Sequence, residues 1–122
     1  MYVKHTYESL RTMHPHLISF TIDSTELACT QGGQLFRKMK SQHWKEVENK
    51  KNHSKGYNVI LINKKQYTRA KVILYAHGKI SLEDKNVNIY HINGNRLDCT
   101  LDNLTLTSAS DVINIHNKEI GS

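Results

Sequence analysis

One stretch of the sequence brings together residue types that could carry out acid–base chemistry. It runs His91-Ile92-Asn93-Gly94-Asn95-Arg96-Leu97-Asp98 and is followed closely by Leu101-Asp102-Asn103-Leu104. An imidazole is suited to accept a proton at neutral pH. Asn93-Gly94 favours a tight turn, because both residues tolerate a positive φ better than most. A single histidine beside a turn is more often an ordinary surface residue. His91 is a candidate catalytic residue only because of the residues spaced around it.

The positive charge of the chain is concentrated between residues 37 and 71. The 17 lysines and arginines exceed the 11 acidic residues and give a net charge of +6, yet this segment alone carries +9. A lysine-rich run is usually a solvated face, but here aromatic residues such as Trp44 and Tyr57 lie among the cations. Cations with interleaved aromatics suit a polyanion whose phosphates and bases can both be contacted.

We therefore predict nucleic acid as the partner of this segment. A membrane surface fits less well, since no basic amphipathic helix with a broad apolar face is visible. The residues expected to contact DNA are Arg37, Lys38, Lys40, Trp44, Lys50, Lys51, Lys64, Lys65, Arg69 and Lys71, together with Arg96 beside His91.

The elements that must position these residues are short. In the first half of the chain we expect a helix over 7–13 that ends before Pro15, and a strand over 17–22. A turn at 31–34 leads into a strand over 35–37, and residues 38–55 read as a polar loop.

The second half has stronger local signals. Strands over 58–62 and 66–69 flank a polar turn and predict a β-hairpin, and the apolar run 70–77 predicts a helix that ends at Gly78. A strand at 87–91, a turn at 92–95 and a loop to Asn103-Leu104 then precede a further strand and a second short helix, with Ser108 as a candidate N-cap.

Length and composition limit the fold class. A chain of 122 residues fits one compact domain, and 38% hydrophobic residues with a single proline exclude a low-complexity chain. No apolar run approaches the roughly 18 residues of a membrane span, and the polar start lacks the apolar stretch of a secretory signal. Cys29 and Cys99 form no C-x-x-C pair and read as free thiols. We expect a soluble, cytoplasmic protein.

The stretch around His91, together with Asp102-Asn103-Leu104, resembles the core of phage-type HNH endonucleases. Gly56-Tyr57 and the run 69–74 sit where that family has a G-Y hairpin and a short helix, so the resemblance covers about residues 56–117. It implies a ββα-metal finger that holds one divalent cation, Mg²⁺ or Mn²⁺, against a scissile phosphate, in the cytoplasm of a bacterial host if the gene is phage-borne.

The resemblance also implies roles for individual residues. His91 matches the general base, and Asn103 matches the central asparagine that orients the base. Two metal-ligand positions depart from the family, because they read Tyr90 and Val112, and neither a neutral phenol nor an aliphatic side chain suits a hard cation. Asp111 or His116, close by in the sequence, would serve as the substitute metal ligand.

Together these features predict a small single-domain α+β protein with β-hairpins, short helices and a ββα-metal motif. Residues 1–55 would form an N-terminal segment with a basic arm, and residues 56–122 the HNH-like part. The predicted function is metal-dependent hydrolysis of DNA phosphodiester bonds. The alternative is a catalytically degenerate HNH fold that binds DNA, or inhibits a host nucleic-acid enzyme, without cleavage.

Overall fold

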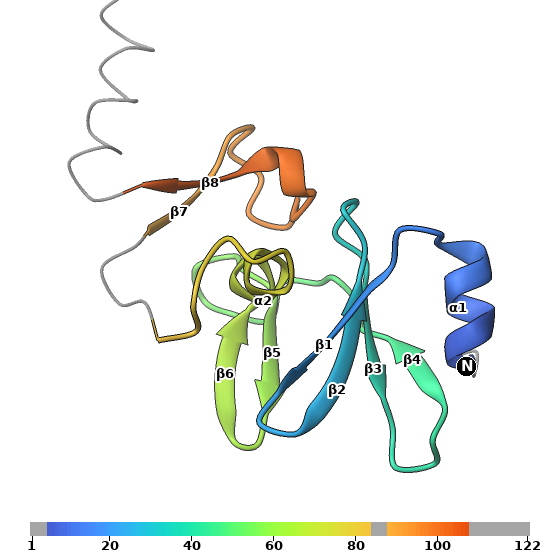
Figure 1. Cartoon of the computed structure of the whole chain (residues 1–122). Helices are drawn as coiled ribbons and strands as arrows, with labels where there is room; N and C mark the ends of the chain where they lie inside the picture. Colours follow the sequence, from blue (N-terminus) through green and yellow to red (C-terminus); the bar gives the residue numbers. More distant parts are fainter. Residues whose placement is uncertain (1–4, 84–87, 108–122) are drawn as a thin grey trace, which may run out of the picture.

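The computed structural model describes residues 5–83 and 88–107, and begins with a helix and a four-stranded antiparallel sheet (Figure 1). The helix α1 spans Tyr7–Met13. The sheet has the order β1-β2-β3-β4, which is also the order along the chain. Its strands are β1 (Ile18–Ile22), β2 (Thr25–Cys29), β3 (Leu35–Lys38) and β4 (Trp44–Glu46).

Two further antiparallel hairpins complete the fold. β5 (Val59–Ile62) pairs with β6 (Lys65–Thr68), and helix α2 (Arg69–Ala76) follows at once. β7 (Asn88–His91) pairs with β8 (Leu104–Thr107), which follows the 3₁₀ helix η1 (Leu101–Asn103). The predicted α+β class with hairpins and short helices is confirmed. Within the described residues, no helix is long and apolar enough to cross a bilayer.

Local sequence explains the sharp ends of these elements. The β1–β2 turn places Asp23 and Ser24 at positive φ (48° and 65°), and the β5–β6 turn does the same with Asn63 and Lys64 (49° and 68°). Two consecutive positive-φ residues make the type of two-residue turn whose twist matches that of antiparallel strands. Helix α2 begins at a threonine cap, since the Thr68 hydroxyl accepts a hydrogen bond from the backbone N–H of Lys71 at 3.3 Å.

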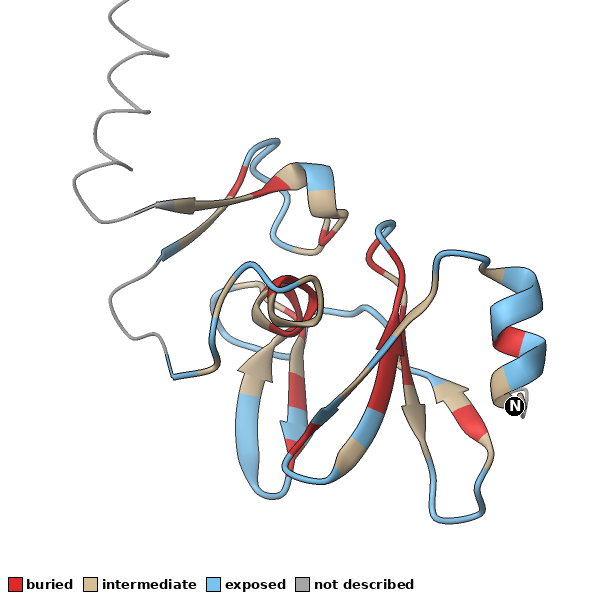
Figure 2. Ribbon diagram, viewed as in Figure 1, coloured by how far each residue is buried: buried red, intermediate tan, exposed pale blue. Residues whose placement is uncertain are grey.

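The main core lies between one face of the four-stranded sheet and the elements β5, α2 and β8. Leu27 and Leu35 of the sheet are fully buried against Ile62 of β5 and Ile73 of α2, and Leu104 of β8 belongs to the same cluster. Figure 2 shows α2 as a largely buried helix at the centre of the molecule. Residues on both sides of position 55 thus share one core, and the division into 1–55 and 56–122 stays a prediction.

The opposite face of the sheet carries a second, smaller cluster under α1. Trp44 is 5% exposed and packs with Leu10, Ala28 and Phe36. Its ring lies 5.4 Å from that of Tyr7, centroid to centroid. The prediction that Trp44 contacts DNA is therefore wrong, because the indole is committed to the packing of α1 on the sheet.

Arg69 is the second residue that burial removes from the predicted DNA contacts. It is 2% exposed. Its Nε donates to the carbonyl of Gly33 at 3.0 Å, and its Nη1 donates to the carbonyl of Val47 at 2.9 Å and to Oδ1 of Asn58 at 3.2 Å. Arg69 therefore ties the start of α2 to the first sheet and to the segment before β5, and it has no free face for a phosphate.

The β7–β8 region is anchored to the first sheet by backbone contacts. The N–H of Leu101 donates to the carbonyl of Gln31 at 2.7 Å. Gly33, at φ +88°, lies so close to Cys99 that an added Cβ would be 2.9 Å from its carbonyl carbon and oxygen. Only glycine permits this approach, so the turn after β2 fixes the place of the loop that leads into η1.

Two strands were missing from the sequence expectations. β4 lies within the predicted loop 38–55, and β2 had no predicted counterpart. Three consecutive residues of β2, Leu27–Cys29, are buried, so the strand lacks the alternation that marks a half-exposed strand. The expected helix over 7–13, the strand near 17–22, the β5–β6 hairpin and the helix ending at Gly78 are confirmed within one or two residues.

Candidate active site

His91 is the last residue of β7 and pairs across the hairpin with Leu104, the first residue of β8. The chain leaves the strand in a tight turn, in which the N–H of Gly94 donates to the carbonyl of His91 at 2.9 Å and Gly94 has φ +78°. The next backbone link joins the N–H of Ile92 to the carbonyl of Asn103 at 2.8 Å. Hairpin pairing and this turn thus fix the backbone on both sides of His91.

The side chain of Asn103 forms hydrogen bonds with the turn and loop that follow His91. Its Oδ1 accepts from the N–H of Asn93 at 2.9 Å, and its Nδ2 donates to Oδ1 of Asn93 at 3.0 Å and to the carbonyl of Asp98 at 2.9 Å. These bonds hold the turn and the following loop as one unit. Among the described residues no hydrogen bond joins Asn103 to the His91 ring, and the role of Asn103 in orienting His91 stays a prediction.

Asp98 is the carboxylate of this loop. Its Oδ2 accepts from Nδ2 of Asn93 at 2.7 Å, and its Oδ1 accepts from the N–H of Thr100 at 3.2 Å. Hydrogen bonds from the side chain and backbone of Thr100 are the main reason that the pKa of Asp98 is lowered, and Asn93 and His91 act in the same direction. Asp98 is therefore ionised near His91 at neutral pH.

A loop from a distant part of the chain lies against the His91 turn. In this loop, residues 49–57, the side chain of Asn49 donates to the carbonyl of Leu97, and Nη1 of Arg96 donates to the carbonyl of Lys55. The guanidinium carbon of Arg96 lies 5.1 Å from the ring centroid of Tyr57, within cation–π range. The Tyr57 ring is in turn 6.1 Å from the His91 ring.

Burial and charge together favour the neutral form of His91. The residue is 6% exposed, and its Nε2 is buried without a hydrogen-bond partner in the described part of the chain. Burial is the largest cause that lowers the pKa of His91 below 6.5, and the positive charge of Arg96 lowers it further, while Asp98 opposes both. A neutral imidazole can accept a proton at pH 7, as a general base must.

The metal ligands implied by the resemblance are not found in the described residues. No group of three or more His, Cys, Asp or Glu side chains close enough to hold a metal ion occurs between residues 5 and 83 or between 88 and 107. Tyr90, next to His91, offers only a phenol, and Asp98 is held by Asn93 and Thr100. Asp111 and His116 lie outside the described residues, so their role as ligands stays a prediction.

The remaining predicted DNA contacts differ in how accessible they are. Arg37 donates to the carbonyl of Leu61 at 2.9 Å, and Lys38 pairs with Glu26 at 2.9 Å, so both are partly engaged within the fold. Lys71 is half-buried on α2. The exposed members of the set are Lys40, Lys50, Lys51, Lys64, Lys65 and Arg96.

His91 is thus a buried histidine whose neutral form is favoured, at the end of a hairpin strand and beside a loop that bears lysines. Residues 67–112 match the model of the HNH endonuclease family. The match begins in β6 and includes α2, β7, η1 and β8. No curated protein and no solved structure matches the chain.

Sequence reasoning missed the part that Tyr57 and Asp98 play at this site. In the sequence Tyr57 lies within the basic segment and at the start of the hairpin, and Asp98 ends the stretch that begins at His91. No local pattern links Tyr57 to a histidine 34 positions later. The aspartate does carry a local signal, because Asn93 and Asp98 are five residues apart across a turn that must close.

The charge of Arg96 gives a testable effect on His91. Replacing Arg96 with Gln should raise the pKa of His91, because it removes a positive charge that disfavours the imidazolium. The ring-proton shifts of His91, followed by NMR from pH 4 to pH 8, measure this directly. Arg11→Gln is the matched control, since Arg11 also lies over a tyrosine ring, that of Tyr7 on α1. An unchanged His91 titration in Arg96→Gln would contradict the electrostatic assignment.

Proposed function

We propose that the protein is a phage-type HNH endonuclease that hydrolyses phosphodiester bonds of double-stranded DNA with His91 as general base. The observation that carries this proposal is the packing of loop 49–57 on the His91 turn, through Arg96 to Lys55 and Asn49 to Leu97. This packing brings the exposed, basic part of the chain to the residue that can accept a proton. A DNA backbone attracted by the lysines would then lie next to the imidazole.

In the proposed reaction His91 takes a proton from a water molecule as that water attacks the phosphorus atom. A new phosphorus–oxygen bond forms to the water oxygen, the ester bond to the leaving oxygen breaks, and the leaving oxygen takes up a proton from solvent. Because Nε2 is buried, the water must approach the other ring nitrogen, Nδ1. In this proposal Arg96, which is exposed and lies near the ring, would contact the phosphate.

A divalent ion such as Mg²⁺ or Mn²⁺ would act as Lewis acid at the phosphate in a nuclease of this kind. Since the described residues offer no ligand cluster, the ion would depend on Asp111 or His116, or on the substrate itself. The HNH match gives nucleic acid as the substrate class; cleavage itself and the choice of DNA belong to the proposal.

The second candidate is a protein of the same fold that binds DNA, or a host nucleic-acid enzyme, without cleaving. Tyr90 favours it, because a phenol replaces the side chain that binds metal in the active enzymes that the sequence resembles. A scaffold that kept its basic loop and lost its ligands would still bind a polyanion. Competition by DNA would separate a nucleic-acid site from an acidic protein partner.

Incubation with supercoiled plasmid in Mg²⁺ or Mn²⁺, beside an EDTA control, tests the first proposal. Nicking that needs the metal supports the endonuclease. No nicking in either metal, together with a retained gel shift, overturns cleavage and supports the binding protein. Loss of both would contradict the proposal that the basic segment contacts DNA.

The lysines of loop 49–57 should set the salt dependence of binding. Their backbone is fixed, because the side chain of Asn58 donates to the carbonyl of Lys50 at 2.9 Å, while both Lys50 and Lys51 are exposed. Changing both lysines to Glu should weaken binding to every sequence, and should reduce the slope of log K against log [salt] by about 2 if each lysine neutralises one phosphate.

The control for this change is Lys79→Glu, an exposed lysine just after α2 and outside the basic segment. Fluorescence anisotropy on two unrelated duplexes, over a series of salt concentrations, gives both slopes. An unchanged slope in the double variant, or an equal drop in Lys79→Glu, would show that loop 49–57 is not the DNA contact.

A further inference from the structure

A hollow lies on the face of the four-stranded sheet that carries α1, away from His91 and its hairpin. Helix α1 covers only part of this sheet face, and beside it a cavity of about 420 Å³ stays open. That volume lies within the roughly 300–1,000 Å³ of ligand sites. The hollow is built from α1 and from β1 to β4, which precede the segment that matches the HNH family.

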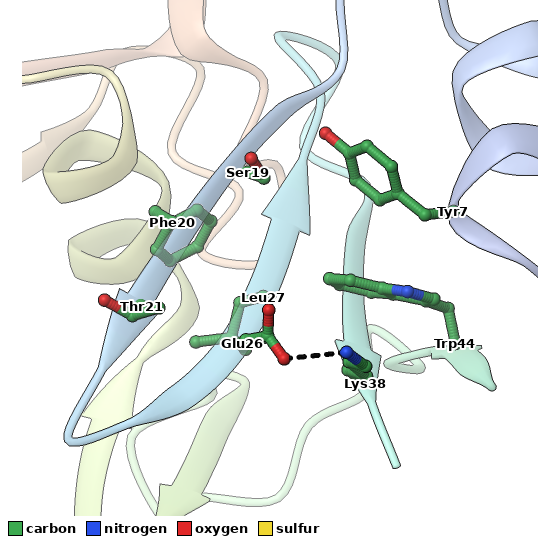
Figure 3. Close-up of a pocket in the computed structure, with 8 residues that line it drawn as sticks. All are labelled: Tyr7, Ser19, Phe20, Thr21, Glu26, Leu27, Lys38 and Trp44. Atoms are coloured by element: carbon green, nitrogen blue, oxygen red, sulfur yellow. Dashed lines mark ion pairs between the residues drawn. The ribbon is translucent and has the colours of Figure 1, made fainter. Parts of the chain in front are cut away.

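Figure 3 shows two kinds of side chain around this hollow. Tyr7 and Trp44 line one side with aromatic rings, and the hydroxyl residues Ser19 and Thr21 of β1 line the other. At one end Glu26 and Lys38 form an ion pair of 2.9 Å. One carboxylate oxygen of Glu26 faces Lys38, and the other points into the hollow (Figure 3).

This combination is suited to a flat heteroaromatic ring with hydrogen-bonding groups along one edge. The Tyr7 ring, which is only partly buried and packs against the buried Trp44 ring, provides a surface on which a nucleobase can stack. The ion pair then reads the edge of the base, because a lysine ammonium only donates hydrogen bonds and a carboxylate only accepts them. The side chain of Glu26 is 53% exposed, so its carboxylate can contact a ligand without a rearrangement of the sheet.

We propose that this hollow binds a nucleobase, with Glu26 and Lys38 as the residues that read its edge. Guanine fits best, since its O6 accepts from an ammonium and its N1–H and N2–H donate to a carboxylate. The base would be that of a free nucleotide or of an unpaired nucleotide in a strand. The site is separate from His91, so it does not depend on the proposed cleavage reaction.

The chain carries its own reporter, because Trp44 is the only tryptophan and lines the hollow. Titration with GMP should quench Trp44 fluorescence in a saturable manner, and IMP, which lacks the 2-amino group, should bind about tenfold more weakly because one hydrogen bond to a charged group is lost. A guanine-bearing single-stranded oligonucleotide, compared with one made of thymine alone, forms the second arm. Tighter binding of the oligonucleotide than of GMP would identify the source as a strand.

Two variants, Glu26→Gln and Ser19→Phe, test the site, and Glu48→Gln is the control. Glu26→Gln should weaken GMP binding about tenfold or more, whereas Glu48→Gln, which removes the same charge beside another lysine, Lys50, should leave it within about twofold. Ser19→Phe should block the hollow without touching Glu26. Thermal unfolding shows that each variant is folded. The proposal is overturned if GMP and the oligonucleotides give no saturable quenching, or if Glu26→Gln and Ser19→Phe bind like the parent.

Discussion

His91→Ala should abolish plasmid nicking while leaving DNA affinity nearly unchanged. General bases contribute about 10²–10⁴-fold to a rate, and in the described part of the site His91 is the residue placed to take this role. Affinity should persist because it depends on the exposed lysines of loop 49–57, whose backbone is held by Asn52 and Asn58. Initial nicking rates and gel-shift affinities on the same plasmid measure the two effects separately.

Because His91 is buried, its removal could also disturb the hairpin. His91→Gln, closer in volume, keeps the packing against Tyr57 and cannot act as a base near neutral pH, so it should be as inactive as the alanine variant. His16→Ala is the matched control, since His16 is exposed and far from the site in sequence. Equal loss of nicking and affinity in both His91 variants would mean that the residue is structural.

Arg69→Leu should lower the free energy of unfolding by about 3 kcal/mol. Removing a buried, fully bonded charged partner leaves its acceptors without donors. Here the carbonyls of Gly33 and Val47 and Oδ1 of Asn58 all lose their hydrogen bonds. Urea unfolding followed by far-UV circular dichroism measures the change.

The control for Arg69 is Arg37→Leu. Arg37 is half-buried and makes one bond to a backbone carbonyl, that of Leu61, so its loss should cost less than about 1 kcal/mol. If the two variants unfold at the same urea concentration, Arg69 is not the link between α2 and the first sheet. A lower DNA affinity in folded Arg69→Leu would restore the original prediction that Arg69 contacts DNA.

The sequence predicted the elements whose signals are local. Thr68 at the start of α2, Gly78 after it and the polar turn between β5 and β6 each act on their immediate neighbours, so their effect can be read along the chain. β2 could not be found this way, because α1 covers one of its faces and the main core covers the other. Which faces of a strand are covered depends on residues far away in the sequence.

The candidate site shows the same division. His91 and Asn103 were identified together because both lie in the stretch that resembles the HNH core, whereas Tyr57 reaches His91 only through the packing of loop 49–57. Arg69 and Arg96 show how residue type alone misleads. Both are arginines in basic surroundings, but Arg69 opens a helix that is buried on the sheet, and Arg96 lies in an exposed turn.

The close contact between the first sheet and the β7–β8 region has a consequence for how such a protein can change by recombination. The segment that matches the HNH family buries Ile73, Cys99 and Leu104 against strands that lie outside the match. A transplanted copy of this segment would need a recipient surface that supplies the same apolar partners, and also a glycine where Gly33 meets Cys99. Successful exchanges between proteins should therefore carry β1 to β3 along with the β7–β8 hairpin.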